Sequence, residues 1–354
     1  MMKILVTGGA GYIGSVVVAR LLEQRHHVEV LDDLSTGHHD AVAGEAVWHR
    51  RPLRSAGEVL DGSFDAVVHL AARSLVGESM QHPERYWHGN IVETLALLDA
   101  MRHHSVPRLV FSSTAAVYGD AGSDPITEMT ATQPTNPYGA SKLAIDHMLT
   151  AEATAHGLGA VSLRYFNVAG AYGALGEHHD PETHLIPNLL TAAEHHRDGR
   201  DYAPAQIFGT DYPTRDGTAV RDYIHITELA DAHVLALEHA TPGTHEILNL
   251  GTGVGTSVRE VVDAVRQVTG VPIQVREADR RPGDPPVLVA SGAQARRLLG
   301  WVPEARVTAM IQDAWTARSQ HAPGPPVVRD APTPAGGHLR PGSRSPELPP
   351  SSSS

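Results

Sequence analysis

The sequence contains no cysteine, few aromatic residues and no excess of positive charge. The lack of cysteine excludes disulfides, thiol nucleophiles and thiolate metal sites. Lysine and arginine total 28 against 40 acidic residues, and the formal charge of −12 argues against a nucleic-acid partner. No apolar run approaches the roughly 20 residues of a membrane span, and no leader with a cleavage site is visible. We therefore expect a cytoplasmic protein with no membrane partner.

The C-terminal stretch 322–354 differs in composition from the rest of the 354 residues. It holds 9 of the 25 prolines and ends in four serines. Such a composition does not offset the entropy lost on ordering the chain, so it predicts a disordered Pro/Ser-rich tail.

Strand-like and helix-like segments alternate through the first 320 residues. Short apolar runs predict strands, and segments with helical spacing predict the helices between them. The strands are expected at Lys3–Thr7, His27–Leu31, Ala66–Leu70 and Arg108–Ser112, and the helices at Ser15–Gln24 and Ile91–Met101. This order predicts an α/β protein with a doubly wound parallel sheet, whose ligands bind at the carboxyl ends of the strands.

A glycine-rich turn ends the first expected strand and leads into the first expected helix. Its sequence is Thr7-Gly8-Gly9-Ala10-Gly11-Tyr12-Ile13-Gly14. Glycines allow a tight turn and a close approach of the backbone to a pyrophosphate, which the free N–H groups of a helix N-terminus attract. Asp32 ends the next strand, where a carboxylate accepts the ribose hydroxyls of NAD and repels the additional phosphate of NADP. The turn therefore predicts a Rossmann-type site for NAD.

A second motif, Asn136-Pro137-Tyr138-Gly139-Ala140-Ser141-Lys142, predicts the start of a helix, with Asn136 as N-cap and Pro137 in the first turn. Tyr138 and Lys142 are four residues apart and share one helix face. A neighbouring ammonium and an oxidised nicotinamide both stabilise a phenolate and lower the pKa of tyrosine from about 10. We therefore expect Tyr138 to act as a general base near neutral pH.

Together these motifs resemble the extended short-chain dehydrogenase/reductases, and more closely the nucleotide-sugar 4-epimerases among the NAD-dependent epimerases and dehydratases. The resemblance runs from residue 3 to about residue 318. It rests on residues 31–37 (LDDLSTG), 69–72 (HLAA), 76–79 (VGES), 111–114 (FSST), 117–119 (VYG) and 164–167 (RYFN). The block 207–225, with IFGTDYPT, DGT and VRDYIH, resembles the epimerases specifically.

The resemblance implies the interconversion of UDP-galactose and UDP-glucose by inversion at C4 of the sugar. Tyr138 would take the proton of the 4-hydroxyl while a hydride moves from C4 to NAD. The transient 4-keto sugar would rotate, and the hydride would return to its opposite face. Thr114 matches the residue of the family that hydrogen-bonds the 4-oxygen, and Lys142 is expected to hold the nicotinamide ribose. NAD would stay tightly bound, without net redox change.

The resemblance also assigns binding residues by position. The expected contacts of NAD are Gly8, Gly11, Tyr12, Ile13, Gly14, Asp32, Asp33, Leu34, Ser35, Thr36, Gly37, Leu53, Leu70, Ala71, Ala72, Asn90, Ser112, Tyr138, Lys142 and Tyr165. The expected contacts of the UDP-sugar are Thr114, Asn167, His184, Leu185, Phe208, Arg221, Arg281 and Asp284. The two arginines suit a diphosphate because a guanidinium donates two parallel hydrogen bonds.

Two lobes and a dimer follow from the same resemblance. The NAD-binding Rossmann domain is expected over residues 1–168, with segments near 219–240 returning to it. A smaller mixed α/β lobe over 169–320 would bind the UDP-sugar, with the site between the two. A homodimer is expected to form through the helices near Pro83–His103 and the helix that carries Tyr138.

Four positions depart from the pattern of the family. Ser74 stands where a lysine is frequent, and Pro52 stands where an aspartate contacts adenine. His184 lies within Thr-His-Leu in place of Asn-Asn-Leu, and Leu288 falls near the position that sorts hexoses from N-acetylhexosamines. A UDP-N-acetylhexosamine or UDP-glucuronate 4-epimerase therefore stays an alternative.

Two other classes are less favoured. A nucleotide-sugar 4,6-dehydratase has an acid–base pair after its threonine, where this chain has Ala115-Ala116. A non-catalytic NAD-sensing protein would be signalled by the loss of Tyr138 or Lys142, and both are present.

Two further patterns are not expected to bind ligands. The glycines of residues 251–255 (GTGVG) lie between an expected strand, Ile247–Leu250, and an expected helix, Val258–Val268, but no second Tyr/Lys pair accompanies them. Adjacent histidines such as His195-His196 do not share a helix face, and no His-Glu-x-x-His occurs. The 23 histidines therefore predict no metal site.

Overall fold

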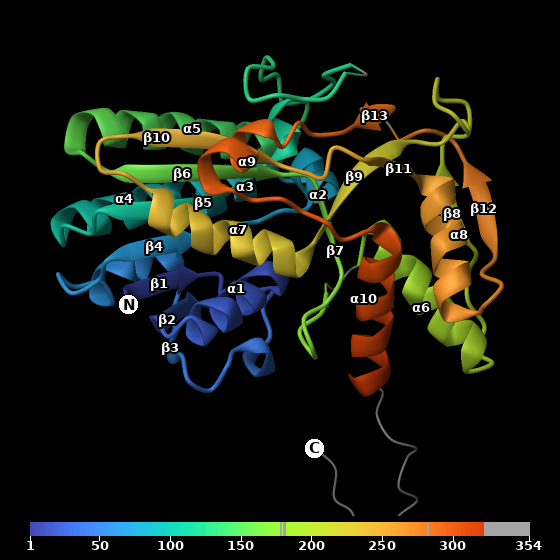
Figure 1. Ribbon diagram of the computed structural model, residues 1–354, viewed down its shortest axis with the longest axis horizontal. Coiled ribbons are helices and arrows are strands. Elements are labelled where there is room, and N and C mark those ends of the chain that lie inside the picture. The colour runs from blue at the N-terminus through green and yellow to red at the C-terminus, as the bar shows by residue number, and fades with distance from the viewer. Residues whose placement is uncertain (123, 178, 180–181, 282, 322–354) are drawn as a thin grey trace, which may run out of the picture. The chain divides into compact units, whose positions relative to one another are not determined.

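The computed structural model describes residues 1–321 apart from 123, 178, 180–181 and 282, and its largest sheet has seven parallel strands (Figure 1). Its strand order is β10-β6-β5-β4-β1-β2-β3. The strands are β1 (Lys3–Thr7), β2 (His27–Asp32), β3 (Val47–Arg50), β4 (Ala66–His69), β5 (Arg108–Thr114), β6 (Gly159–Tyr165) and β10 (His245–Leu250). The order reverses between β1 and β4, where a doubly wound sheet binds its ligands. The expected tail 322–354 lies outside the described residues.

Helices cover both faces of this sheet, which confirms the predicted fold class. One core holds buried side chains of α1 (Tyr12–Glu23), α7 (Ile226–His239) and α9 (Ala293–Leu299). The other holds buried side chains of α4 (Glu93–His103) and α5 (Pro137–His156). The core strands are apolar without alternation because they are buried on both faces.

The helix predicted at Ile91–Met101 begins differently in the structure. A π-helical turn, η3 (Trp87–Val92), precedes α4. The side chain of Asn90 within it accepts a hydrogen bond from Arg73 N at 2.8 Å and donates to Ser141 Oγ at 2.9 Å. Single π-helical turns inside helices are frequent at functional sites. Helical spacing of apolar residues does not reveal this local widening.

A smaller lobe contains two further sheets. In one, β9 (Val220–His225) pairs with β7 (Asn167–Ala169), β11 (Gly255–Ser257) and β13 (Val287–Leu288); in the other, β8 (Ala205–Phe208) pairs with β12 (Val275–Ala278). Their core is shared with α6 (Leu185–Arg197), α8 (Val258–Thr269) and α10 (Val307–His321). Residues Met1–His321 form one unit by their contacts.

Several late segments lie in the large sheet or against it. The segment expected near 219–240 contributes α7, and β10 and α9 join the same core. The remaining helical segments are η1 (His39–Ala41), η2 (Leu53–Glu58), α2 (Val76–Gln81), α3 (Pro83–Tyr86) and η4 (Ala115–Val117). Among the described residues, no helix is both long and apolar enough to cross a bilayer.

A buried ion pair attaches α5 to the sheet. Asp146 Oδ2 on α5 accepts hydrogen bonds from Arg164 Nε at 3.0 Å and Nη2 at 2.8 Å on β6. Both side chains are at most 4% exposed. Arg164 also donates to the hydroxyl of Tyr118, which in turn donates to Asn249 on β10 at 2.7 Å. The pair therefore sets the position of α5 relative to β6 and β10.

Removing the charge of Asp146 tests this attachment. Asp146→Asn leaves the Arg164 guanidinium buried and unpaired, so we expect the free energy of unfolding to fall by about 3–5 kcal/mol. Glu152→Gln is the control, because Glu152 on the same helix pairs with the partly exposed Arg102, and such pairs contribute about 1 kcal/mol or less. Urea unfolding measures both, and equal losses would contradict the role of the buried pair.

Candidate active site

The glycine-rich turn closes tightly at the carboxyl end of β1. Gly8 has a positive φ of 75°, and a Cβ there would lie 2.5 Å from the backbone N of Ala71. A Cβ on Gly14 would lie 2.1 Å from the carbonyl O of Gly8. These two positions require glycine because protein backbone occupies the space of a side chain.

Gly11 has no such internal reason to be glycine. Its φ of −78° suits any residue, and a Cβ there would make only an ordinary contact, 3.4 Å from Gly8 O. Gly11 is the N-cap of α1, and no side chain caps that helix. The bare N-terminus fits a bound diphosphate, for which close approach of the backbone and free N–H groups are needed. The residues present therefore fit NAD at this turn.

Asp32 is held rigidly at the carboxyl end of β2. Its Oδ2 accepts from Ala10 N at 3.0 Å, and its Oδ1 accepts from Leu34 N at 2.8 Å. Burial raises the pKa of this carboxyl, and the two backbone hydrogen bonds oppose that shift. Leu34 has a positive φ of 62°, so the expected NAD-contacting loop of residues 33–37 turns sharply away from the strand. The carboxylate is thus fixed between the glycine turn and this loop, where the adenosine ribose is expected.

The loop after β4 lies against the glycine turn, as its expected contact with NAD requires. Buried His69 is hydrogen-bonded to Thr7 Oγ1 at 2.7 Å and to Thr94 Oγ1 at 2.8 Å. Burial, together with the Lys142 charge, lowers the pKa of His69 to about 3, so the ring stays neutral. Residues 70–72 begin here, and Ala71 is the residue that Gly8 touches.

Thr114 and Tyr138 lie together at the carboxyl end of β5, an interior strand of the large sheet. Thr114 ends β5 beside Tyr165 of β6. Asn136 caps α5 by accepting from Gly139 N at 2.8 Å, which confirms the predicted cap and sets Tyr138 in the first turn. Burial raises the pKa of Tyr138, and its hydrogen bond with the Thr114 side chain lowers it.

Lys142 points at the backbone rather than at the Tyr138 hydroxyl. Its Nζ donates to the carbonyl O of Ser112 at 2.8 Å, and the Ser112 hydroxyl is hydrogen-bonded to Tyr165. Burial lowers the pKa of Lys142 to about 7, against the opposing charge of Asp146. The chain's own groups therefore leave the pKa of Tyr138 raised. The ammonium of Lys142 and the oxidised nicotinamide are the two cations expected to stabilise the phenolate. Because Lys142 binds the Ser112 carbonyl, the nicotinamide is the one that remains.

The low pKa of Lys142 makes stability depend on pH. An unfolded lysine titrates near 10.4, and the folded one at about 7, so between these values the unfolded chain binds more protons. Raising the pH from 7 to 9.5 should therefore stabilise the fold, by on the order of 1 kcal/mol per pH unit from this group. Lys142→Met should lack that increase. Urea unfolding of cofactor-free protein at several pH values measures the two slopes, and equal slopes would contradict the burial of this amine.

The residues expected to bind the diphosphate and uridine lie in the smaller lobe. Arg221 on β9 is buried and pairs with the Asp284 carboxylate. The Arg281 guanidinium lies over the Phe208 ring, 4.0 Å from its centroid. Two guanidinium groups and one aromatic face thus gather around β8, β9 and the segment after β12, where they are able to take a nucleoside diphosphate.

Asn167 on β7 lies beside Tyr223 of β9, and Leu185 begins α6. His184, expected to contact the substrate, is the residue before that helix. Its Nδ1 lies 2.8 Å from both Glu177 Oε1 and Glu182 Oε1. Burial lowers the pKa of His184, but the two carboxylates outweigh it and raise the pKa to about 10.

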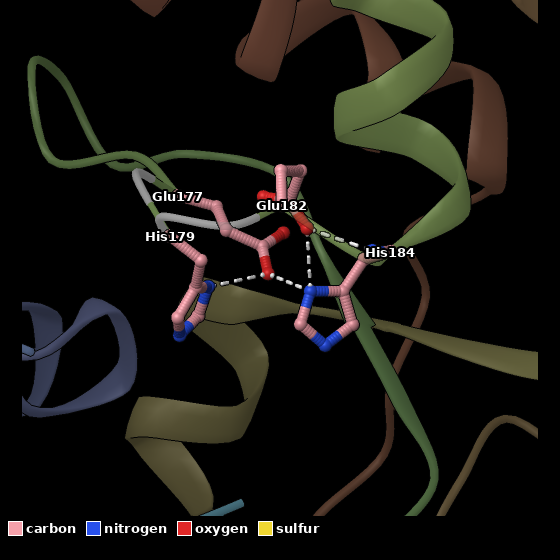
Figure 2. Close-up of side chains that lie close together, drawn as sticks. All are labelled: Glu177, His179, Glu182 and His184. Carbon is pink, nitrogen blue, oxygen red and sulfur yellow. Dashed lines mark hydrogen bonds and ion pairs between the residues drawn. The ribbon is translucent and has the colours of Figure 1, made fainter. Parts of the chain in front are cut away.

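Sequence reasoning missed the group formed by Glu177, His179, Glu182 and His184 (Figure 2). The signal was present as Glu-x-His-x-x-Glu-x-His over residues 177–184, a spacing that differs from His-Glu-x-x-His. The four side chains come together in the segment between β7 and α6, and spacing alone does not show that.

The second glycine-rich segment, residues 251–255, serves the protein itself. The Asp222 carboxylate accepts from Thr252 N at 2.8 Å, from Gly253 N at 2.9 Å and from Ala290 N at 3.1 Å. These backbone donors are the ones that a phosphate would need. An internal carboxylate therefore holds the loop.

The sequence matches the family described as the NAD dependent epimerase/dehydratase family over residues 4–251, and the chain belongs to that family. It is 54% identical to the UDP-glucose 4-epimerase of Corynebacterium glutamicum over 321 residues, which cover 90% of this chain and 96% of that one. It is 53% identical to the UDP-glucose 4-epimerase of Streptomyces lividans over 327 residues, covering 91% and 98%.

Solved structures give the same result. A crystal structure of UDP-glucose 4-epimerase superposes with a TM-score of 0.85 at 44% identity, covering 90% of this chain and 98% of that one. A UDP-glucose-4-epimerase from Stenotrophomonas maltophila, with bound NAD and formylated UDP-arabinopyranose, has a TM-score of 0.85 at 39% identity, covering 90% and 99%. The predicted family, fold class and dependence on NAD are thereby confirmed.

Proposed function

We propose that the chain interconverts UDP-galactose and UDP-glucose by inverting C4 of the sugar. The observation that carries this is the meeting of Thr114, Tyr138 and Lys142 at the carboxyl ends of β5 and β6, beside a turn that fits NAD. Likeness at 54% identity to a UDP-glucose 4-epimerase supports the substrate.

In this proposal Tyr138 moves the proton of the 4-hydroxyl. NAD, when bound, accepts a hydride from C4 and returns it. Tyr138 takes the proton in the first half of the reaction and gives it back in the second, while its partner Thr114 donates to and accepts from the 4-oxygen. Lys142, held at the Ser112 carbonyl, is placed to fix a ribose hydroxyl.

The smaller lobe would hold the UDP group while the 4-keto sugar rotates. Arg221 and Arg281 would bind the diphosphate, with Phe208 against the uracil and Asp284 against the ribose. Asp284 pairs with Arg221 in the structure, so the carboxylate orients one of the two guanidinium groups before substrate arrives. Firm binding at the UDP end lets the sugar end turn without release.

The test follows UDP-glucose formed from UDP-galactose with NAD present. We expect Tyr138→Phe to lower kcat by at least about 100-fold, because the proton then has no acceptor. Tyr202→Phe is the matched control and should be unaffected, since the Tyr202 hydroxyl accepts a weak hydrogen bond from Gln274 N at 3.4 Å, outside the site.

Two outcomes would redirect the proposal. If NAD binds but no UDP-glucose forms, the proposed substrate is wrong. Turnover of UDP-N-acetylgalactosamine alone would then assign the N-acetylhexosamine reaction, with half-buried Leu288 on β13 as the first position to vary.

We also propose that the chain forms a homodimer and acts in the cytoplasm, where nucleotide sugars and NAD are present. Of ten large apolar side chains exposed in the described residues, five lie between residues 76 and 95: Val76, Met80, Trp87, Val92 and Leu95. Val76 and Met80 belong to α2, whereas Trp87, Val92 and Leu95 belong to η3 and α4, within the stretch Pro83–His103 that is expected at the interface. A concentration of exposed apolar side chains on neighbouring helices is typical of a contact with another protein surface.

A charge placed on this surface should break the dimer. We expect Leu95→Glu to shift the protein from dimer to monomer, because Leu95 is 47% exposed on α4 and would be buried against the partner. Val302→Glu, at a similarly exposed valine outside these helices, is the control. Analytical ultracentrifugation measures both, and an unchanged dimer in Leu95→Glu would place the interface elsewhere.

A further inference from the structure

Four potential metal ligands meet in the segment that joins β7 to α6. One ligand atom from each of Glu177, His179, Glu182 and His184 lies within 4.8 Å of all the others. His179 Nδ1 is 3.1 Å from Glu177 Oε1, and His184 Nδ1 is 2.8 Å from both Glu177 Oε1 and Glu182 Oε1. In Figure 2 both rings turn a nitrogen toward the carboxylates between them. Both ring nitrogens thus face the Glu177 carboxylate, and that of His184 faces Glu182 as well.

In this group one ring nitrogen of His184 serves two carboxylates. A ring nitrogen carries at most one hydrogen, yet His184 Nδ1 faces two carboxylate oxygens at 2.8 Å. Glu182 Oε1 already accepts from the backbone N of Thr183 and of His184, each at 2.7 Å. One proton is therefore shared between two anionic acceptors. A dication at this point would neutralise both carboxylates and accept a lone pair from each ring.

The donor set identifies the kind of ion. Two imidazoles and two carboxylates suit zinc and neighbouring divalent transition metals, whereas Ca²⁺ and Mg²⁺ prefer sites made of oxygen alone. Four bonds of about 2.0–2.2 Å in a tetrahedron place the ligand atoms roughly 3.3–3.6 Å apart. Side chains within 4.8 Å of one another reach that spacing by moving about 1 Å.

The position of the group in the fold gives the ion a structural role. Leu185, the residue after His184, begins α6 and is expected to line the UDP site. On the other side the two glutamates act on Tyr12, whose hydroxyl donates to Gly170 O at 2.7 Å. Burial is the main cause that raises the pKa of Tyr12, and the negative charges of Glu177 and Glu182 raise it further. The segment therefore lies between the first turn of α1 and the start of α6.

We propose that Glu177, His179, Glu182 and His184 bind one divalent transition-metal ion of the zinc type, which fixes the segment between the glycine turn and α6. The ion touches neither Thr114, Tyr138 nor Lys142. It acts by holding the start of α6 in place. This site goes beyond the proposed epimerisation, and its test does not use that activity.

The binding test uses the full chain with no affinity tag, because added histidines would bind the same ions. The protein is treated with a chelator, freed of it by dialysis, and titrated with Zn²⁺ by calorimetry and with Co²⁺ by visible absorption. We expect one equivalent to bind with a dissociation constant in the micromolar range or below, and Co²⁺ to show the intense bands of a four-coordinate N/O site.

Substitution identifies the ligands. His179→Ala and Glu182→Gln should each weaken metal binding by at least about tenfold. Changing a residue that only hydrogen-bonds to a metal ligand already lowers metal affinity by about that factor. His179 makes one ion pair at a partly exposed position, so its loss leaves the rest of the segment intact. His195→Ala/His196→Ala, at the other end of α6, is the control and should bind as the wild type does. Circular dichroism confirms that each variant is folded.

Three results would overturn the site. They are no stoichiometric binding by the wild type, equal binding by folded His179→Ala and the wild type, and loss of binding in the His195/His196 control as well. In the first two the group is an ion pair built around a protonated His184, and in the third the ion binds surface histidines. Epimerase assays on the same preparations show separately whether the proposed function holds.

Discussion

The placement of the reactive residues depends on the buried ion pair between Arg164 and Asp146. It joins α5 to β6, and its extension through Tyr118 reaches Asn249 on β10. Asp146 follows Lys142 by one helical turn, so the same carboxylate that anchors the helix also opposes the loss of charge at the buried amine. Because Lys142 binds the Ser112 carbonyl, a shift of α5 would move Tyr138 away from Thr114 on β5. One desolvated contact therefore supports the whole group.

The glycines of the turn separate into two kinds. At Gly8 and Gly14 a side chain would collide with neighbouring backbone atoms, so these positions must be glycine. At Gly11 no atom of the described residues excludes a side chain, and the open space fits the approach of a ligand. The loop at 251–255 shows the opposite case, since Asp222 accepts from the donors that a phosphate would use. Similar glycine patterns thus serve different purposes, depending on whether the protein itself supplies an anion.

The chemistry of Tyr138 is divided between the chain and its cofactor. Burial raises the pKa of the hydroxyl, the hydrogen bond with Thr114 opposes that shift, and Lys142 binds the Ser112 carbonyl. A base that becomes effective when the nicotinamide cation is beside it is active only in the assembled site. The activation of Tyr138 therefore depends on NAD being bound.

The sequence by itself determined the local parts of this protein. Apolar runs, glycine and proline positions and residue spacing located four local features: β1 at Lys3–Thr7, the Asn136 cap, the glycine turn and the Tyr138/Lys142 pair. Each of these features depends on neighbours within a few residues. Tertiary structure alone decided which way Lys142 points, the return of β10 and α9 to the large sheet, and the convergence of Glu177, His179, Glu182 and His184. Those features depend on contacts between segments that are distant in sequence or folded back in a loop, and composition and spacing carry no information about such contacts.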